Sequence, residues 1–174
     1  MIFDAGYLLL IAALVFSGYG VFAGFWGGYK QNQRLIASSF HTVHAVFALV
    51  LGASLILWYA LLFDRFEVIY VWNHSERALQ SFYKFAALWG GQAGSLLFWV
   101  LILASFSVVV VLQNRQRHRA LMPYVNGALM GSAGFFLLLL VVAANPVGRV
   151  DFIPAGGQGL NPLLQNYWMV IHPG

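Results

Sequence analysis

Residues 85–112 read FAALWGGQAGSLLFWVLILASFSVVVVL, a run of 28 positions without a charged side chain. A helix rises about 1.5 Å per residue, so this segment is long enough to cross the ~30 Å hydrocarbon layer of a bilayer. Residues 5–28, 37–63 and 121–144 are also long and apolar. Their length and their lack of period-two alternation exclude strands. The sequence therefore predicts an all-α, polytopic membrane protein whose four transmembrane helices lie within residues 1–144.

The overall composition excludes several classes of protein. Of the 174 residues, 61% are hydrophobic and 8% are charged, which leaves too few polar side chains to cover a soluble globule. The nine Lys and Arg residues form no basic stripe, so we expect no nucleic-acid partner. Because the chain has no cysteine, any cofactor must be held by His, Met, Tyr or carboxylate groups. The N-terminal apolar run is too long for a cleaved signal peptide and is expected to remain as a membrane helix.

Charged residues divide between the two ends of the predicted bundle. The short turns carry five cations and no carboxylate, namely Lys30, Arg34, Arg115, Arg117 and Arg119. All five carboxylates, with the other four cations, fall near the N-terminus, in the loop at 64–84 or after residue 144. Because cytoplasmic loops are enriched in Lys and Arg, we expect both termini on the periplasmic side.

Small residues recur at four-residue spacing in three of the spans. They are Gly20, Gly24 and Gly28, then Gly90 and Gly94, then Gly127 and Gly131. Such spacing lets helix backbones approach closely, so it predicts helix packing. Aromatic residues near the predicted span ends, Tyr70 and Tyr83 among them, are expected to anchor the helices at the membrane interface.

Residues 145–174 differ in composition from the spans. Four prolines and five glycines fall within these 30 residues, which prevents a long helix. However, Leu160, Leu163, Leu164 and the run YWMVI at 167–171 are too apolar for a freely solvated segment. We therefore expect a folded external tail that lies against the membrane or a partner.

Few residues can carry chemistry. No phosphate loop, nucleophile elbow or metal-binding helix motif is present, and the carboxylates lie at span ends, so no catalytic residue is predicted. His41 and His44 share one helix face, where they can bind a metal or a haem edge, or be packed and hydrogen-bonded. At most one of them can ligate a given haem. His74 is interpreted as solvated within NHSER, and His118 has no assigned role.

His172 has different surroundings. It follows an apolar run in MVIHP and precedes a proline that fixes the local backbone, so we expect it close to the membrane on the outer side. A neutral imidazole is a common axial ligand to iron. On the residues alone, two interpretations stay open: a haem-iron ligand and an exposed juxtamembrane residue.

Two blocks of sequence carry a family resemblance. WGGQAGSLLFW at 89–99 resembles a pattern of Trp-Gly-Gly, then Gly-Ser-Leu-Leu, then Trp, and LNPLLQNYWMVIHP at 160–173 resembles an Asn-Pro-Leu-Leu-Gln run that leads to His-Pro. Both patterns are found in the N-terminal region of the CcmF family of cytochrome c-type biogenesis proteins, which are haem lyase subunits. Two long matches at the expected separation are more specific than one short motif.

The resemblance implies a protein of the bacterial inner membrane that receives haem at its outer face and joins it to the CXXCH cysteines of apocytochrome c. It implies that His172 is an axial ligand to the haem iron. The implied partners are apocytochrome c, the haem-delivery and reductant components of cytochrome c maturation, and the rest of the lyase.

The sequence also departs from the family pattern. Ala93 stands where an acidic residue is common, and Gly174 stands where a second proline follows the histidine. The tryptophan-rich haem platform, the second external histidine and the two histidines for a transmembrane b-type haem are absent. We therefore expect the front portion of a longer or split lyase, not a complete enzyme. The alternatives are a noncatalytic scaffold or docking subunit, and a specialised paralogue that serves a nitrite reductase cytochrome.

Overall fold

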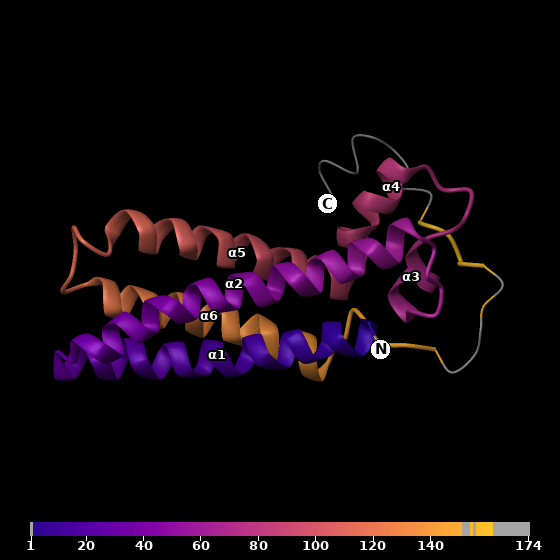
Figure 1. Cartoon of the computed structure of the whole chain (residues 1–174). Coiled ribbons are helices and arrows are strands. Elements are labelled where there is room, and N and C mark those ends of the chain that lie inside the picture. Colours follow the sequence, from indigo (N-terminus) through magenta and orange to yellow (C-terminus); the bar gives the residue numbers. More distant parts are fainter. Residues whose placement is uncertain (1, 151–153, 155, 162–174) are drawn as a thin grey trace.

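The computed structural model describes residues 2–150, 154 and 156–161. Within these residues the chain forms six α-helices and one 3₁₀ helix (Figure 1). They are α1 (Ile2–Lys30), α2 (Gln33–Leu62), α3 (Ile69–His74), α4 (Ser81–Ala86), η1 (Ala87–Trp89), α5 (Gln92–Asn114) and α6 (Met122–Val142). Four of the helices, α1, α2, α5 and α6, are long and apolar enough to cross a membrane. The prediction of an all-helical chain with four candidate spans is confirmed.

The four long helices form an up-down-up-down bundle (Figure 1). α1 packs against α2 and α6, and α5 packs against the same two helices, so the four close into a ring. The turns at 31–32 and 115–121 lie at one end, called here the turn end. The N-terminus, the segment 63–91 and the described residues after 142 lie at the other, called here the cap end. All described carboxylates are at the cap end.

Two helix starts differ from the predicted span boundaries by four residues or more. α2 begins at Gln33, not at residue 37, because the Asn32 side chain caps it and accepts hydrogen bonds from the Arg34 and Leu35 N–H groups (3.1 and 3.3 Å). α5 begins at Gln92, not at residue 85, because the Gly91 backbone is extended (φ −143°, ψ 167°) and interrupts the helix. Residues 81–89 instead form α4 and η1, which belong to the cap.

Glycines allow α1 and α6 to cross closely. A Cβ atom added to Gly24 would lie 2.7 Å from the Pro123 carbonyl oxygen and 3.0 Å from the Gly127 nitrogen. At Gly20 it would lie 2.8 Å from the Met130 Cγ of α6 and 2.6 Å from the Thr42 Oγ1 of α2. No side chain fits at such distances, so the predicted packing role of these glycines is confirmed.

Polar groups inside the bundle are satisfied mainly by their own helices. The Ser39 and Ser54 hydroxyls donate to the Ile36 and Val50 carbonyl oxygens (2.9 and 2.8 Å). Asn126 on α6 is an exception, since its Nδ2 donates across the bundle to the Ser39 carbonyl oxygen (2.9 Å). This hydrogen bond between α6 and α2 fixes how far one helix is shifted along the other. The remaining contacts between the two helices are mainly apolar.

Candidate functional site

The cap combines the two sequence blocks that carried the family resemblance. It consists of α3, α4 and η1, the turn into α5, and the described residues after α6 (Figure 1). A short backbone pairing joins its two halves: the Ile69 N–H donates to the Gly148 carbonyl oxygen (2.8 Å), and the Val150 N–H donates to the Glu67 carbonyl oxygen (3.0 Å). The segment after α6 is therefore tied to the start of α3.

The Tyr70 hydroxyl organises the Trp-Gly-Gly turn. It donates to the Ala87 and Leu88 carbonyl oxygens (2.8 and 2.9 Å) and accepts from the Gly91 N–H (3.0 Å). These backbone groups lie at the break between η1 and α5, where the helical hydrogen bonds are incomplete. The Ala87 carbonyl oxygen also accepts from the Gly90 N–H (3.1 Å). The Tyr70 side chain is buried, and burial raises the pKa of its phenol, so the hydroxyl keeps its proton. The prediction that Tyr70 anchors the chain at the membrane interface is wrong, because the loop folds back over the ring.

Two glycines of the motif are required by close contacts. A Cβ atom at Gly94 would overlap the Leu88 carbonyl oxygen and the Tyr70 hydroxyl, and one at Gly91 would overlap the His74 imidazole. The motif serine closes the same turn, since the Ser95 hydroxyl donates to the Trp89 carbonyl oxygen (2.8 Å). The spacing of the WGGQAGS block therefore reflects a turn built tightly around α3.

His74 lies inside this arrangement. Its Nδ1 is 2.9 Å from the Tyr70 carbonyl oxygen, and its ring stacks on the Tyr70 ring with centroids 4.4 Å apart. The ring is half-buried. The interpretation of His74 as solvated is wrong, because α3 turns the imidazole toward Gly91 and the start of α5.

The segment 156–161 docks on α3 and on the Trp-Gly-Gly turn. The Gln158 N–H donates to the Trp72 carbonyl oxygen (2.7 Å), and the Gly159 N–H donates to the Ser75 carbonyl oxygen (3.1 Å). Leu160 is buried, and its Cδ1 lies 3.1 Å from where a Cβ of Gly90 would be. The first residue of the second block thus contacts the second residue of the first block. The described part of the tail is folded against the protein.

A buried ion pair holds α4 on the end of α2. The Lys84 Nζ donates to both carboxylate oxygens of Asp64 (2.6 and 2.7 Å), and the Lys84 side chain is 8% exposed. The Phe85 ring stacks on Trp58 of α2 at 4.8 Å between centroids. Together these contacts fix the segment that leads into the Trp-Gly-Gly turn.

The histidines singled out from the sequence do not come together. His172 lies outside the described residues. His41 and His44 lie toward the turn end, where His41 is exposed and the His44 Nδ1 is 3.0 Å from the Phe40 carbonyl oxygen within α2. His118 is exposed in the basic turn. In the part of the chain that the structure describes, no group of three or more His, Cys, Asp or Glu side chains is placed to hold a metal ion.

Relatives of the chain include cytochrome c-type biogenesis proteins. The chain is 36% identical over 172 residues to the cytochrome c-type biogenesis protein CcmF of Pseudomonas fluorescens, which covers 98% of this chain and 26% of that protein. It is 34% identical over 168 residues to CcmF of Escherichia coli K12, covering 95% and 25%. It is 41% identical over 130 residues to the probable cytochrome c-type biogenesis protein NrfE of the same organism, covering 74% and 23%.

A solved structure shares the fold. The chain superposes on a cytochrome c heme lyase CcmF with a TM-score of 0.81 at 21% identity, over 99% of this chain and 27% of that one. No family model matches the chain. The chain spans about a quarter of the length of the curated relatives it matches.

Proposed function

Because the chain belongs to the CcmF family and matches an N-terminal portion of these proteins, we propose that it is part of a haem lyase that joins haem to apocytochrome c at the outer face of the membrane. In this proposal haem is the cargo that is passed on, and the chain supplies one part of its binding site. The partners are apocytochrome c, the haem-delivery and reductant components of cytochrome c maturation, and the rest of the lyase.

The contact between the two sequence blocks is the observation that carries this proposal. Gly90 and Leu160 meet in the cap, although 70 positions separate them in the sequence. The segment that leads to His172 thus starts from a fixed point on the Trp-Gly-Gly turn. A ligand that must meet an incoming haem in one orientation needs such a rigid support.

His172 is the proposed axial ligand to the haem iron. Among the described residues of the cap, His74 is the imidazole nearest to such a role, but its Nδ1 faces the Tyr70 carbonyl oxygen and its ring packs on Tyr70. In this proposal the described cap is the support for the segment that carries His172. Its exposed rings Phe82 and Phe85 offer apolar surface that suits the face of a macrocycle. The second axial ligand and the aromatic platform are assigned to sequence outside this chain.

The proposed location is the bacterial inner membrane, with both termini and the cap on the periplasmic side. The five cations at the turn end support this orientation, because short cytoplasmic turns are rich in Lys and Arg. Haem chemistry would then take place at the cap end.

A second candidate is a specialised paralogue of the same system. The identity of 41% to the probable NrfE of Escherichia coli favours it. In this version the cytochrome served would be that of a nitrite reductase. A noncatalytic scaffold or docking subunit is the further alternative, and the experiment below separates it from the ligand role.

The test is to co-express the chain with the remaining lyase segments of a relative and compare His172→Ala with the unchanged protein. We expect loss of most bound haem, measured by its absorption spectrum, and loss of covalent cytochrome c. His118→Ala is the matched control, because His118 is an exposed histidine at the opposite end of the bundle. Unaltered haem binding and yield in His172→Ala, with the control also unaltered, would leave only the scaffold role.

A further inference from the structure

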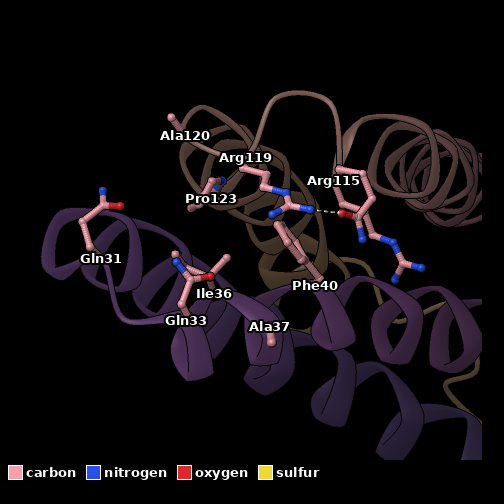
Figure 2. A pocket seen from close by; sticks show the side chains of 10 residues that line it. Gln31, Gln33, Ile36, Ala37, Phe40, Arg115, Arg119, Ala120 and Pro123 are labelled. Atoms are coloured by element: carbon pink, nitrogen blue, oxygen red, sulfur yellow. Dashed lines mark hydrogen bonds between the residues drawn. The ribbon is translucent and has the colours of Figure 1, made fainter.

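A pocket opens at the turn end, far from the cap. Its volume is about 690 Å³, and it lies between the turn after α1, the first turns of α2 and the turn between α5 and α6 (Figure 2). The lining residues are Gln31, Gln33, Ile36, Ala37, Phe40, Arg115, Gln116, Arg119, Ala120 and Pro123. Neither the family resemblance nor the proposed haem chemistry uses this site.

Two arginines give the pocket its charge. Arg115 and Arg119 both come from the turn between α5 and α6 (Figure 2). The Arg119 Nη2 donates to the Gln116 Oε1 (2.6 Å), which holds the guanidinium in place by a neutral partner. Both side chains are exposed, and within the described residues neither forms an ion pair with a carboxylate. The turn end therefore presents two guanidinium groups whose charge no described carboxylate neutralises.

The opposite wall of the pocket is partly apolar, with Gln31 and Gln33 at its edge. Ile36, Ala37 and Phe40 come from the facing start of α2, and Pro123 comes from the first turn of α6 (Figure 2). A free inorganic anion has no apolar surface, so it would gain nothing from contact with these side chains. A ligand with an anionic head and a hydrocarbon body would contact both surfaces at once.

The residues around the pocket are of the kind found in the headgroup layer of a membrane. Trp26, Tyr29 and Tyr124 surround the same end of the bundle and are all exposed. The Lys30 Nζ lies 5.4 Å from the Trp26 ring centroid and 5.3 Å from that of Tyr29. Exposed Trp and Tyr rings on membrane proteins collect at the interface between hydrocarbon and water.

We propose that this pocket binds the phosphate headgroup of an anionic phospholipid, with Arg115 and Arg119 on the phosphate and the wall formed by Ile36, Ala37 and Phe40 against the start of the acyl chains. Arginine suits this role because its planar guanidinium donates two parallel hydrogen bonds to phosphate oxygens. Basic pockets between membrane helices are known to bind anionic headgroups. The site is independent of the haem chemistry proposed above.

Lipid binding can be measured on the purified full chain in detergent by native mass spectrometry. Phosphatidylglycerol is titrated in, with phosphatidylcholine and inorganic phosphate as separate arms. We expect Arg115→Gln and Arg119→Gln each to weaken phosphatidylglycerol binding roughly fivefold. Arg117→Gln is the matched control, because it removes the same charge from the same turn but from outside the pocket, and it should change binding less than twofold.

A second variant tests the pocket without changing its charge. Ala37→Trp places an indole in the space beside Phe40, and it should reduce phosphatidylglycerol binding as strongly as the loss of one arginine. The proposal is overturned if phosphatidylcholine binds as well as phosphatidylglycerol, or if Arg117→Gln weakens binding as much as the pocket variants. It is also overturned if millimolar inorganic phosphate displaces the lipid completely, because the site would then be one for a free anion.

Discussion

The Tyr70 hydroxyl forms hydrogen bonds with backbone groups that lack part of their helical hydrogen bonding. The backbone between η1 and α5 breaks its helical hydrogen bonding at Gly91, and the Tyr70 hydroxyl contacts the carbonyl oxygens and the N–H group left at the break. Ala87 and Leu88 are buried with the ring, so water cannot replace the hydroxyl at their carbonyl oxygens. The stability of the turn thus depends on one phenol from a helix about 20 residues earlier.

Tyr70→Phe should therefore destabilise the cap by about 1–3 kcal/mol, the cost of leaving buried backbone groups without a partner. The measurement is the thermal midpoint of the purified protein in detergent, together with the rate of proteolysis within residues 64–91. Tyr59→Phe is the matched control, because Tyr59 is exposed on α2 and its ring packs on Phe63. Equal effects in the two variants would contradict the assigned role of Tyr70.

Gly94 gives a second prediction at the residue scale. An alanine there would place its Cβ against the Leu88 carbonyl oxygen and the Tyr70 hydroxyl, and backbone cannot move aside cheaply. We expect Gly94→Ala to cost about 1–3 kcal/mol of stability. Gly18→Ala should be neutral or slightly stabilising, because no atom lies within 4 Å of its added Cβ and alanine favours the helix. A thermal midpoint unchanged in Gly94→Ala would show that the turn is looser than described.

At the scale of elements, α4 depends on the ion pair between Lys84 and Asp64. The two partners are not equally buried, since the Lys84 side chain is 8% exposed and that of Asp64 is 27% exposed. An ammonium left without its carboxylate therefore loses more than a carboxylate left without its ammonium.

Asp64→Asn should consequently destabilise the cap by about 3 kcal/mol, and Lys84→Met should cost less. The asparagine also suits the positive φ of 54° at this position, so the expected loss comes from the charge and not from the backbone. Both variants are compared by proteolysis within residues 64–91 and by thermal midpoint. The double variant should be no less stable than Asp64→Asn alone. A larger loss of cap stability in Lys84→Met than in Asp64→Asn would contradict the conclusion that the unpaired ammonium is the more costly group.

The elements differ in how far they could be predicted. Four apolar runs longer than a bilayer needs are sufficient to indicate α1, α2, α5 and α6. The start of α5 could not be predicted, because the apolar pattern continues without interruption through residues 85–91 and only the close contacts with α3 explain why the chain breaks there. α4 carries no periodic signal of its own, since its position is fixed by the ion pair and the Trp58 stack.

At the scale of the whole molecule, the orientation in the membrane can be tested with the chain itself. It contains no cysteine, so a single introduced thiol reports one position. Ala78→Cys lies in the cap and Arg117→Cys lies in the basic turn, and both positions are exposed. We expect a membrane-impermeant maleimide to label Ala78→Cys in spheroplasts and Arg117→Cys only after lysis. The reverse pattern would place the cap in the cytoplasm.

The candidate site was predictable only in outline. The two blocks at 89–99 and 160–173 identified the segments that matter, and the structure brings Leu160 against Gly90. Their meeting point could not be predicted, because it depends on Tyr70 and His74, which belong to neither block. His74 resembled a solvated loop residue beside charged neighbours, and nothing in its local sequence indicated that the loop would fold over α3. His172 stays a prediction from the resemblance.

The contact between Gly90 and Leu160 also sets an order of events during synthesis. The ribosome adds roughly 5–20 residues per second, so the 70 residues between the two positions take roughly 4–14 s to make. Throughout this interval α3 and the Trp-Gly-Gly turn have been synthesised, but the segment that covers them has not. During these seconds a chaperone or a partner subunit can reach the surface of α3 and of the Trp-Gly-Gly turn. The completed chain covers that surface.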